Sequence, residues 1–155
     1  MGDRIPDLYG SIGTDLTWKG LSLSVLTTYS IGGKVYDSLY AGSMNNMYFN
    51  TNFNAHALRR WQKPGDITDV PRMEVGGSYA TTDRFLVDAS YFAIKNITLG
   101  YTFDKPNIKA RIYATVQNPF VITGYKGLDP EVFGGIDNNI YPRSMTSLIG
   151  VSLQF

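Results

Sequence analysis

Apolar and polar side chains alternate along most of this chain. At its C-terminal end, Ile149, Val151, Leu153 and Phe155 alternate with residues that are mostly polar or small. Because successive side chains of a β-strand point to opposite faces, a period of two predicts a strand with one apolar face. The same pattern predicts four more strands, at residues 9–18, 21–31, 96–103 and 108–118.

The predicted strands are long, and their connections alternate in length. Strands of globular proteins commonly have about 5–6 residues, whereas a tilted transmembrane strand needs about 9–11. Tight turns are expected at Lys19–Gly20 and Asp104–Asn107, and long connections at roughly 33–87 and 119–142. Short periplasmic turns and long outer loops are typical of bacterial outer-membrane barrels. The pattern therefore predicts an all-β, antiparallel transmembrane wall with two long extracellular loops.

Aromatic residues lie near the ends of the predicted strands, at Trp18, Tyr29, Tyr91, Tyr101 and Phe103. Aromatic residues favour strands in general. Amphipathic rings also concentrate at membrane interfaces, where they form girdles around barrels. Because the strand lengths agree with a membrane wall, we interpret these residues as an interfacial girdle.

The composition excludes several classes of function. Charged residues make up 17% of the 155 residues, and the formal net charge of +1 offers no basic surface for nucleic acid. The chain has no Cys and a single His, His56, so neither a thiolate site nor a multi-His metal site is expected. No acid–base carboxylate pair is identifiable. We therefore expect no enzymatic activity, no cofactor and no metal.

Five strands are too few to close a barrel, since bacterial outer-membrane barrels begin at about eight. An open sheet in lipid would leave backbone groups unpaired. The first residues also lead into no apolar export signal. The chain is therefore expected to be part of a larger protein. Two alternatives remain open: a soluble carbohydrate-binding β-sandwich or jelly roll, and a small self-assembling barrel.

Five stretches of the sequence resemble, in order and spacing, stretches of the SusC/RagA family of TonB-linked outer-membrane transporters. They are RWQKPGDITDVPR at 60–72, SYFAIKNITLGY at 90–101, VQNPF at 116–120, YKGLDPE at 125–131 and YPR at 141–143. Two residues depart from the family pattern, because Ala93 replaces an Arg and Pro119 replaces a Leu. A role of that Arg is not carried over.

The resemblance implies that residues 1–155 are the C-terminal portion of such a transporter, about the last five strands of a 22-stranded barrel. The plug and the N-terminal part of the barrel would be absent. The family imports glycans or peptides with a SusD-like surface lipoprotein, and contacts the TonB complex through the absent N-terminal parts. This portion alone is not expected to transport. Its outer face is expected to contact outer-membrane lipid.

The C-terminal octet resembles the signal read by the barrel-assembly machinery, through Gly150, Leu153 and Phe155. Leu148 departs from the polar residue that this signal has at its first position. The alternative is an ordinary amphipathic strand. Deleting Phe155 from the full-length protein is expected to impair its assembly.

Two groups of residues are candidates for contact with the substrate. In the outer loops, aromatic side chains lie among asparagines, a combination that suits sugars; they are Tyr36, Tyr40, Tyr48 and Phe49, with Trp61 from the 60–72 loop as a further substrate or lipoprotein contact. The alternative for both loops is packing against themselves. Residues 55–61 are expected to form a short helix, with His56 on the surface.

Along the fourth strand, the polar row Lys109, Arg111, Tyr113 and Gln117 is expected to face the lumen.

Overall fold

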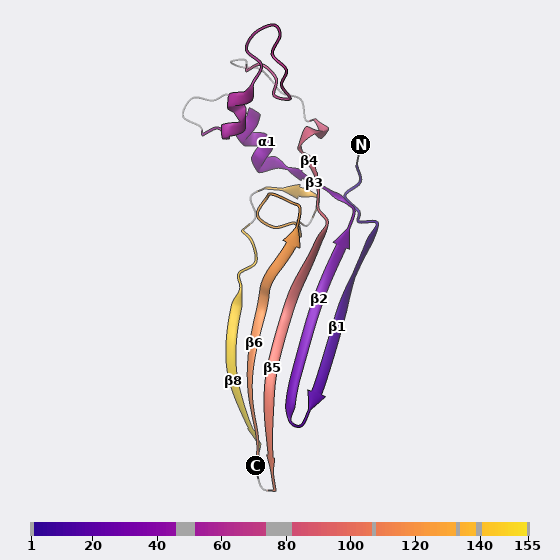
Figure 1. The fold of residues 1–155 in the computed structure, drawn as a ribbon, viewed down its shortest axis with the longest axis vertical. Helices are drawn as coiled ribbons and strands as arrows, with labels where there is room; N and C mark the ends of the chain where they lie inside the picture. Colours follow the sequence, from indigo (N-terminus) through magenta and orange to yellow (C-terminus); the bar gives the residue numbers. More distant parts are fainter. Residues whose placement is uncertain are drawn as a thin grey trace.

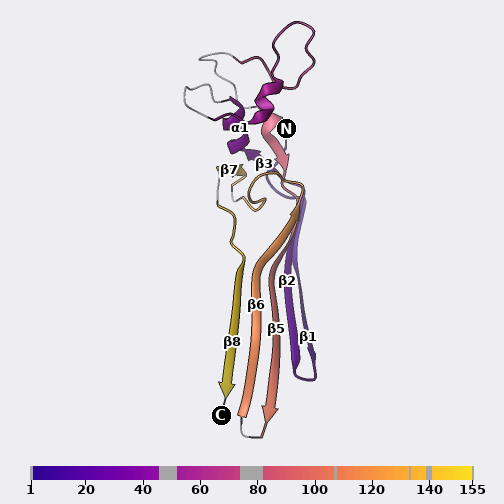
Figure 2. The same ribbon diagram turned by 60° about the vertical axis from the view of Figure 1, so that its left-hand side comes forward.

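The computed structural model describes residues 2–45, 52–73, 82–106, 108–132, 134–138 and 141–154. Five long strands form one antiparallel sheet in the order β1-β2-β5-β6-β8 (Figure 1). Their bounds are β1 Leu8–Trp18, β2 Leu21–Ile31, β5 Tyr91–Lys105, β6 Ile108–Thr123 and β8 Thr146–Gln154. The sheet is tall and curved, and a group of short elements lies beyond one end of it (Figures 1 and 2). The predicted antiparallel β architecture is confirmed.

The two turns at the far end of the sheet are tight. Lys19 and Gly20 join β1 to β2 with positive φ angles of 47° and 87°, as a two-residue type I′ hairpin turn requires. The second turn is shorter than the sequence indicated, because Lys105 pairs with Ile108. The long connection after β6 also starts later than expected, since β6 continues through Pro119 to Thr123.

The sheet has one predominantly apolar face, and that face is uncovered. Cross-strand partners such as Leu16 and Leu23, or Leu99 and Ala114, place the apolar rows of neighbouring strands side by side. Ile149 keeps 79% of its surface exposed. A β-sandwich would bury these side chains against a second sheet, so the exposed face excludes that alternative.

A bulge interrupts the sheet at Lys95. Relative to β2, strand β5 has this one extra residue between Ile94 and Asn96, and β6 has Asn118 and Pro119 opposite it. Asn118 has a φ of 48°, and Pro119 has no amide hydrogen to leave unpaired. The bulge reverses the alternation along β5, so that Ile94 above it and Ile97 below it lie on the same apolar face.

Aromatic side chains occur at both ends of the apolar face. Trp18, Tyr101 and Phe103 lie near the turns, and Tyr29 lies near the opposite end beside Phe92. The interpretation of Tyr91 as part of this girdle is wrong. Tyr91 pairs with Ser30 and Thr123 on the polar face, because the bulge shifts the phase of the upper part of β5.

The short elements form a separate group, which we call the cap. Its sheet has the order β4-β3-β7, and its elements are β3 Lys34–Asp37, β4 Leu86–Asp88, β7 Ile136–Asp137, α1 Ser38–Asn45, η1 Ala55–Arg59 and η2 Asp83–Phe85. The helix expected at 55–61 is the 3-10 helix η1. A small core of Ala41, Met44, Ala57, Val70 and Phe85 holds the cap together. Among the described residues, no helix is both long enough and apolar enough to cross a membrane.

Candidate functional site

The polar row of β6 lies on the face opposite the apolar one. Lys109, Arg111, Tyr113 and Gln117 alternate along this strand. Lys109 lies 3.5 Å from the Asp104 carboxylate. The Arg111 guanidinium donates a hydrogen bond to the Ser22 hydroxyl at 3.4 Å and lies 5.7 Å from the centre of the Tyr113 ring. The structure thus brings the four predicted residues onto one surface that carries many hydrogen-bonding groups.

The Tyr113 ring lies directly over Gly150 of β8. The two residues are cross-strand partners, and a Cβ atom added at Gly150 would lie 2.3 Å from Tyr113 Cζ. No side chain fits between the ring and the β8 backbone. Gly150, one of the residues predicted to form an assembly signal, therefore has a packing role in this structure.

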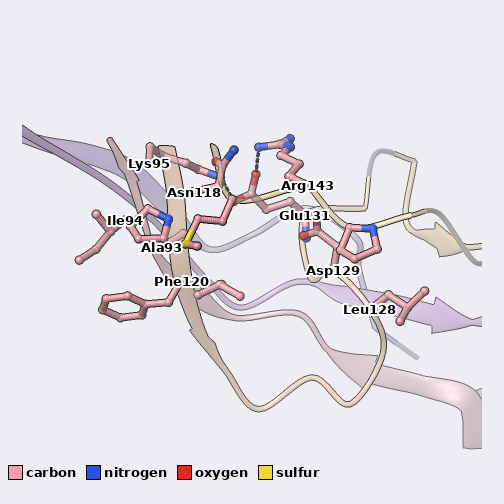
Figure 3. Close-up of a pocket in the computed structure, with 13 residues that line it drawn as sticks. Ala93, Ile94, Lys95, Asn118, Phe120, Leu128, Asp129, Glu131 and Arg143 are labelled. Atoms are coloured by element: carbon pink, nitrogen blue, oxygen red, sulfur yellow. Dashed lines mark hydrogen bonds and ion pairs between the residues drawn. The ribbon is translucent and has the colours of Figure 1, made fainter. Parts of the chain in front are cut away.

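A second site forms where the bulge meets the connection after β6 (Figure 3). The Glu131 carboxylate forms an ion pair with Lys95, and its other oxygen accepts a hydrogen bond from Arg143 Nη1 at 2.5 Å. The Glu131 side chain is 12% exposed and that of Lys95 is 18% exposed. The largely buried Glu131 carboxylate therefore links Lys95 of β5 to Arg143. Two separate parts of the connection between β6 and β8 are in this way held against the sheet.

Polar contacts around this ion-pair site hold the backbone in place. The Glu131 N–H donates to Asp129 Oδ1 at 2.9 Å, and Asn118 Nδ2 donates to the Ser144 carbonyl at 3.5 Å. The residues enclose an open cavity of about 290 Å³, with Ile94 and Phe120 among its apolar lining (Figure 3). The arrangement suits a structural clamp, since each carboxylate oxygen of Glu131 already has a cationic partner within the chain.

Tyr125 attaches the same connection to the cap. Its hydroxyl donates to Asp137 Oδ2 at 2.5 Å, and Asp37 is the register partner of Asp137 in the parallel β3–β7 pair. Burial raises the pKa of the Tyr125 hydroxyl well above its usual range, and the hydrogen bond to Asp137 and the charge of Asp37 raise it further. The hydroxyl therefore remains a donor throughout the physiological range.

Tyr36 and Tyr40, two of the aromatic residues predicted to lie in the outer loops, pack within the cap. The rings of Tyr36 and Tyr40 both meet Phe85 edge-on, at centroid distances of 6.1 and 5.7 Å. The Tyr40 hydroxyl lies 3.0 Å from His56 Nδ1, and both side chains line a cavity of about 610 Å³ that Lys126 also borders. Tyr40 can therefore reach a ligand through this cavity. Tyr48 and Phe49 lie outside the described residues.

The 60–72 loop is held by its own polar groups. Asp66 Oδ2 accepts hydrogen bonds from the backbone N–H groups of Gln62 and Lys63, each at 3.0 Å. The half-buried Trp61 donates its backbone N–H to the Val70 carbonyl at 2.9 Å. Within the described part of the chain, no group of three or more His, Cys, Asp or Glu residues could hold a metal ion.

Known proteins resemble this chain in sequence and in structure. It is 46% identical, over 72% of its length, to the TonB-dependent receptor SusC of Bacteroides thetaiotaomicron. Over its whole length it is 29% identical to the TonB-dependent receptor P3 of Formosa agariphila. The RagAB peptide importer, solved in a closed-closed state, superimposes on 98% of the chain with a TM-score of 0.82 and 29% identity. The chain belongs to the SusC/RagA family of TonB-dependent receptors.

The chain covers only a small part of these SusC/RagA relatives, 10% of SusC, 17% of P3 and 18% of the solved RagAB chain. The relatives are named as receptors or importers and not as enzymes. No protein-family model matches the chain.

The SusC/RagA-like strings of the sequence meet at the ion-pair site. Lys95, Asn118, Glu131 and Arg143 come from four of the five strings and all line its cavity. This site was not predicted from the sequence. A signal for it was present, because Lys95 lies in an otherwise apolar string and Glu131 and Arg143 lie in turn-rich ones. Of the residues predicted to form the assembly signal, Gly150 and Leu153 lie in β8, whereas Phe155 lies outside the described residues.

Proposed function

We propose that the five long strands form part of the wall of an outer-membrane nutrient importer. The observation that carries this proposal is the separation of the two faces of the sheet. One face is apolar and exposed, with Trp18 at 68% and Ile149 at 79%, and suits lipid. The other carries the polar row of β6 and suits a water-filled lumen.

The dimensions of the sheet support a membrane wall. On β2, Leu21 is the cross-strand partner of Trp18 and Tyr101 near the turns, and Tyr29 is the partner of Phe92 near the opposite end. Leu21 and Tyr29 are eight positions apart. This separation corresponds to roughly 26 Å along the strand, or about 20 Å along the membrane normal at a strand tilt of ~40°. The apolar band of such barrels is about 25 Å tall.

We further propose that residues 1–155 are the last section of a 22-stranded barrel, with the cap on the outer surface. The complete receptor would import glycans or peptides, use the TonB complex through parts outside this chain, and bind a SusD-like lipoprotein over the cap. Tyr40 and the cavity beside His56 are the substrate contacts that the geometry favours. Gly150, Leu153 and Phe155 would serve as the signal for the barrel-assembly machinery.

Neighbouring residues on opposite faces of β5 provide a test of the wall. Thr98 and Leu99 lie in the middle of the strand and pair with Thr115 and Ala114. In the full-length receptor, Thr98→Cys is expected to react with a membrane-impermeant maleimide and Leu99→Cys is not, because lipid covers the apolar face. Labelling is measured in outer-membrane vesicles, with detergent-solubilised receptor as the control in which both sites react. The opposite labelling pattern in vesicles would contradict the assignment of the faces.

Deletion of the gene for the full-length receptor tests transport. Growth is expected to be lost on one class of nutrient, either defined oligosaccharides or defined peptides, when that class is the sole source of carbon. Restoring the gene is expected to restore growth, and monosaccharides or free amino acids serve as the control. Unchanged growth on every member of both classes would contradict the proposed import.

A further inference from the structure

The turn end of the apolar face carries a lysine. Lys105 continues the row of Leu99, Tyr101 and Phe103 and pairs with Ile108. It therefore lies on the apolar face, past the aromatic residues. The ends of β5 and β6 extend beyond those of β1 and β2 (Figures 1 and 2). The apolar face thus ends in a cation.

The surface around Lys105 is hollowed. An open hollow of about 370 Å³ is lined by Phe103, Lys105, Pro106, Ile108 and Ala110. Its side walls are apolar and exposed, with Phe103 at 47% and Ile108 at 53%. No cap element lies near this end of the sheet (Figure 1). The hollow is therefore open to whatever surrounds the wall.

The charge of Lys105 is not neutralised within the described part of the chain, where no ion pair involves it. Lys109, four positions further along the chain, differs in this respect. It lies on the polar face and pairs with Asp104 at 3.5 Å. The adjacent turn adds a second cation on the same side, because Lys19 Nζ lies 5.2 Å from the centre of the Trp18 ring.

The two turns lie close enough to act together. The Thr102 N–H donates to the Gly20 carbonyl at 2.8 Å, so the Lys19 turn is level with Thr102. Lys105 follows three residues later on the same strand. Along the sheet, the apolar rows, the aromatic rings and then the ammonium groups match, in order, the acyl chains, interface and phosphates of a lipid leaflet, and the hollow lies between the last ring and Lys105.

We infer that the turn end of β5 and β6 binds an anionic phospholipid of the adjacent leaflet. The acyl chain lies in the hollow between Phe103 and Ile108, and the Lys105 ammonium contacts the headgroup phosphate. Lys19 adds a longer-range attraction. This inference rests on the proposed membrane wall, since only a lipid-facing sheet exposes the hollow to acyl chains. A basic residue near a membrane surface contributes about 1 kcal/mol to binding anionic lipid.

The test uses the full-length receptor in nanodiscs, with spin-labelled phosphatidylglycerol as the probe and spin-labelled phosphatidylcholine as its zwitterionic reference. The wild-type receptor is expected to prefer phosphatidylglycerol. Lys105→Gln is expected to lower its relative association constant about fivefold. Lys109→Gln is the matched control, since it removes the same charge from the same hairpin on the opposite face, and is expected to leave the preference unchanged.

Two results would overturn the inference: no preference of the wild-type receptor for phosphatidylglycerol, or equal losses in both variants, which would indicate net charge alone. Heat-modifiable migration of each variant on gels checks that the barrel has folded. Nutrient uptake is expected to persist in Lys105→Gln. A failure of lipid binding in a folded, transporting receptor therefore contradicts this inference alone, whereas a receptor that forms no barrel contradicts the proposed wall.

Discussion

Replacing Glu131 with glutamine is expected to release the connection between β6 and β8 from the wall. The change leaves the Lys95 ammonium, 18% exposed, beside a neutral group, and weakens the contact with Arg143. Exposed ion pairs contribute about 0–1 kcal/mol, and breaking a buried pair costs about 3–5 kcal/mol. Because these side chains are mostly but not fully buried, we expect a cost of about 2 kcal/mol, between those limits.

The released connection should be cleaved more readily by an external protease. When opening and closing are faster than cleavage, cleavage follows the population of the open form. A cost of about 2 kcal/mol corresponds to a rate roughly 30-fold higher. The measurement is limited proteolysis of the full-length receptor in intact cells, with mapping of cuts between residues 124 and 145.

Two further variants isolate the effect of the buried charge. Arg59→Gln breaks an exposed pair with Asp69, whose side chains are 58% and 67% exposed, and should change cleavage little. Adding Lys95→Gln to Glu131→Gln removes the uncompensated cation, so the double variant should be cleaved less than the sum of the single costs implies. Cleavage of Glu131→Gln at the wild-type rate would show that the ion pairs do not hold the connection.

Gly150→Ala is expected to destabilise the contact between β6 and β8. The new Cβ would lie 2.3 Å from Tyr113 Cζ, so the ring must leave its position over the β8 backbone. Inserting a methyl group into a closely packed contact typically costs about 1–3 kcal/mol. The full-length receptor should therefore lose its heat-modifiable, folded form at a lower temperature.

A double-mutant cycle with Tyr113→Ala gives this prediction its control. Without the ring, Gly150→Ala should cost almost nothing, because alanine suits a strand better than glycine. Gly13→Ala is a matched substitution on the polar face of β1, where the added Cβ meets Leu26 at an ordinary 3.8 Å, and it should be neutral. If Gly150→Ala impairs assembly equally in both backgrounds, recognition of Gly150 by the assembly machinery, rather than its packing, is responsible.

The alternation of apolar and polar residues predicts the strands well wherever it is unbroken. It gives the bounds of β2 and places the polar row of β6 on one face, because a period of two requires no knowledge of distant contacts. It does not predict the part of β5 that precedes Lys95, because this extra residue reverses which side chains of the strand face the apolar side. It also ends β6 too early at Pro119, which a bulge tolerates because no hydrogen bond is required there.

The ion-pair site lies beyond the reach of sequence periodicity. Glu131 is 36 positions from Lys95 and 12 from Arg143, and only the course of the connection brings them together. The packing of Tyr36 and Tyr40 against Phe85 likewise depends on contacts between residues far apart in the sequence. The composition indicated aromatic loops that could bind a ligand, but these contacts decide which faces of the rings remain accessible to one.

The cap has a consequence for the order in which the wall folds. Strands β2 and β5 are neighbours, yet a long segment of chain separates them, and closing a loop costs conformational entropy that increases with its length. Pairing of β3 with β4, which starts at Lys34 and Asp88, holds the ends of β2 and β5 close together and so shortens the loop that pairing of these two strands must close. The small core around Phe85 can form from this segment alone. We therefore expect the cap to form early and to join the two hairpins into one sheet, so weakening its core should slow assembly even where the finished wall is unchanged.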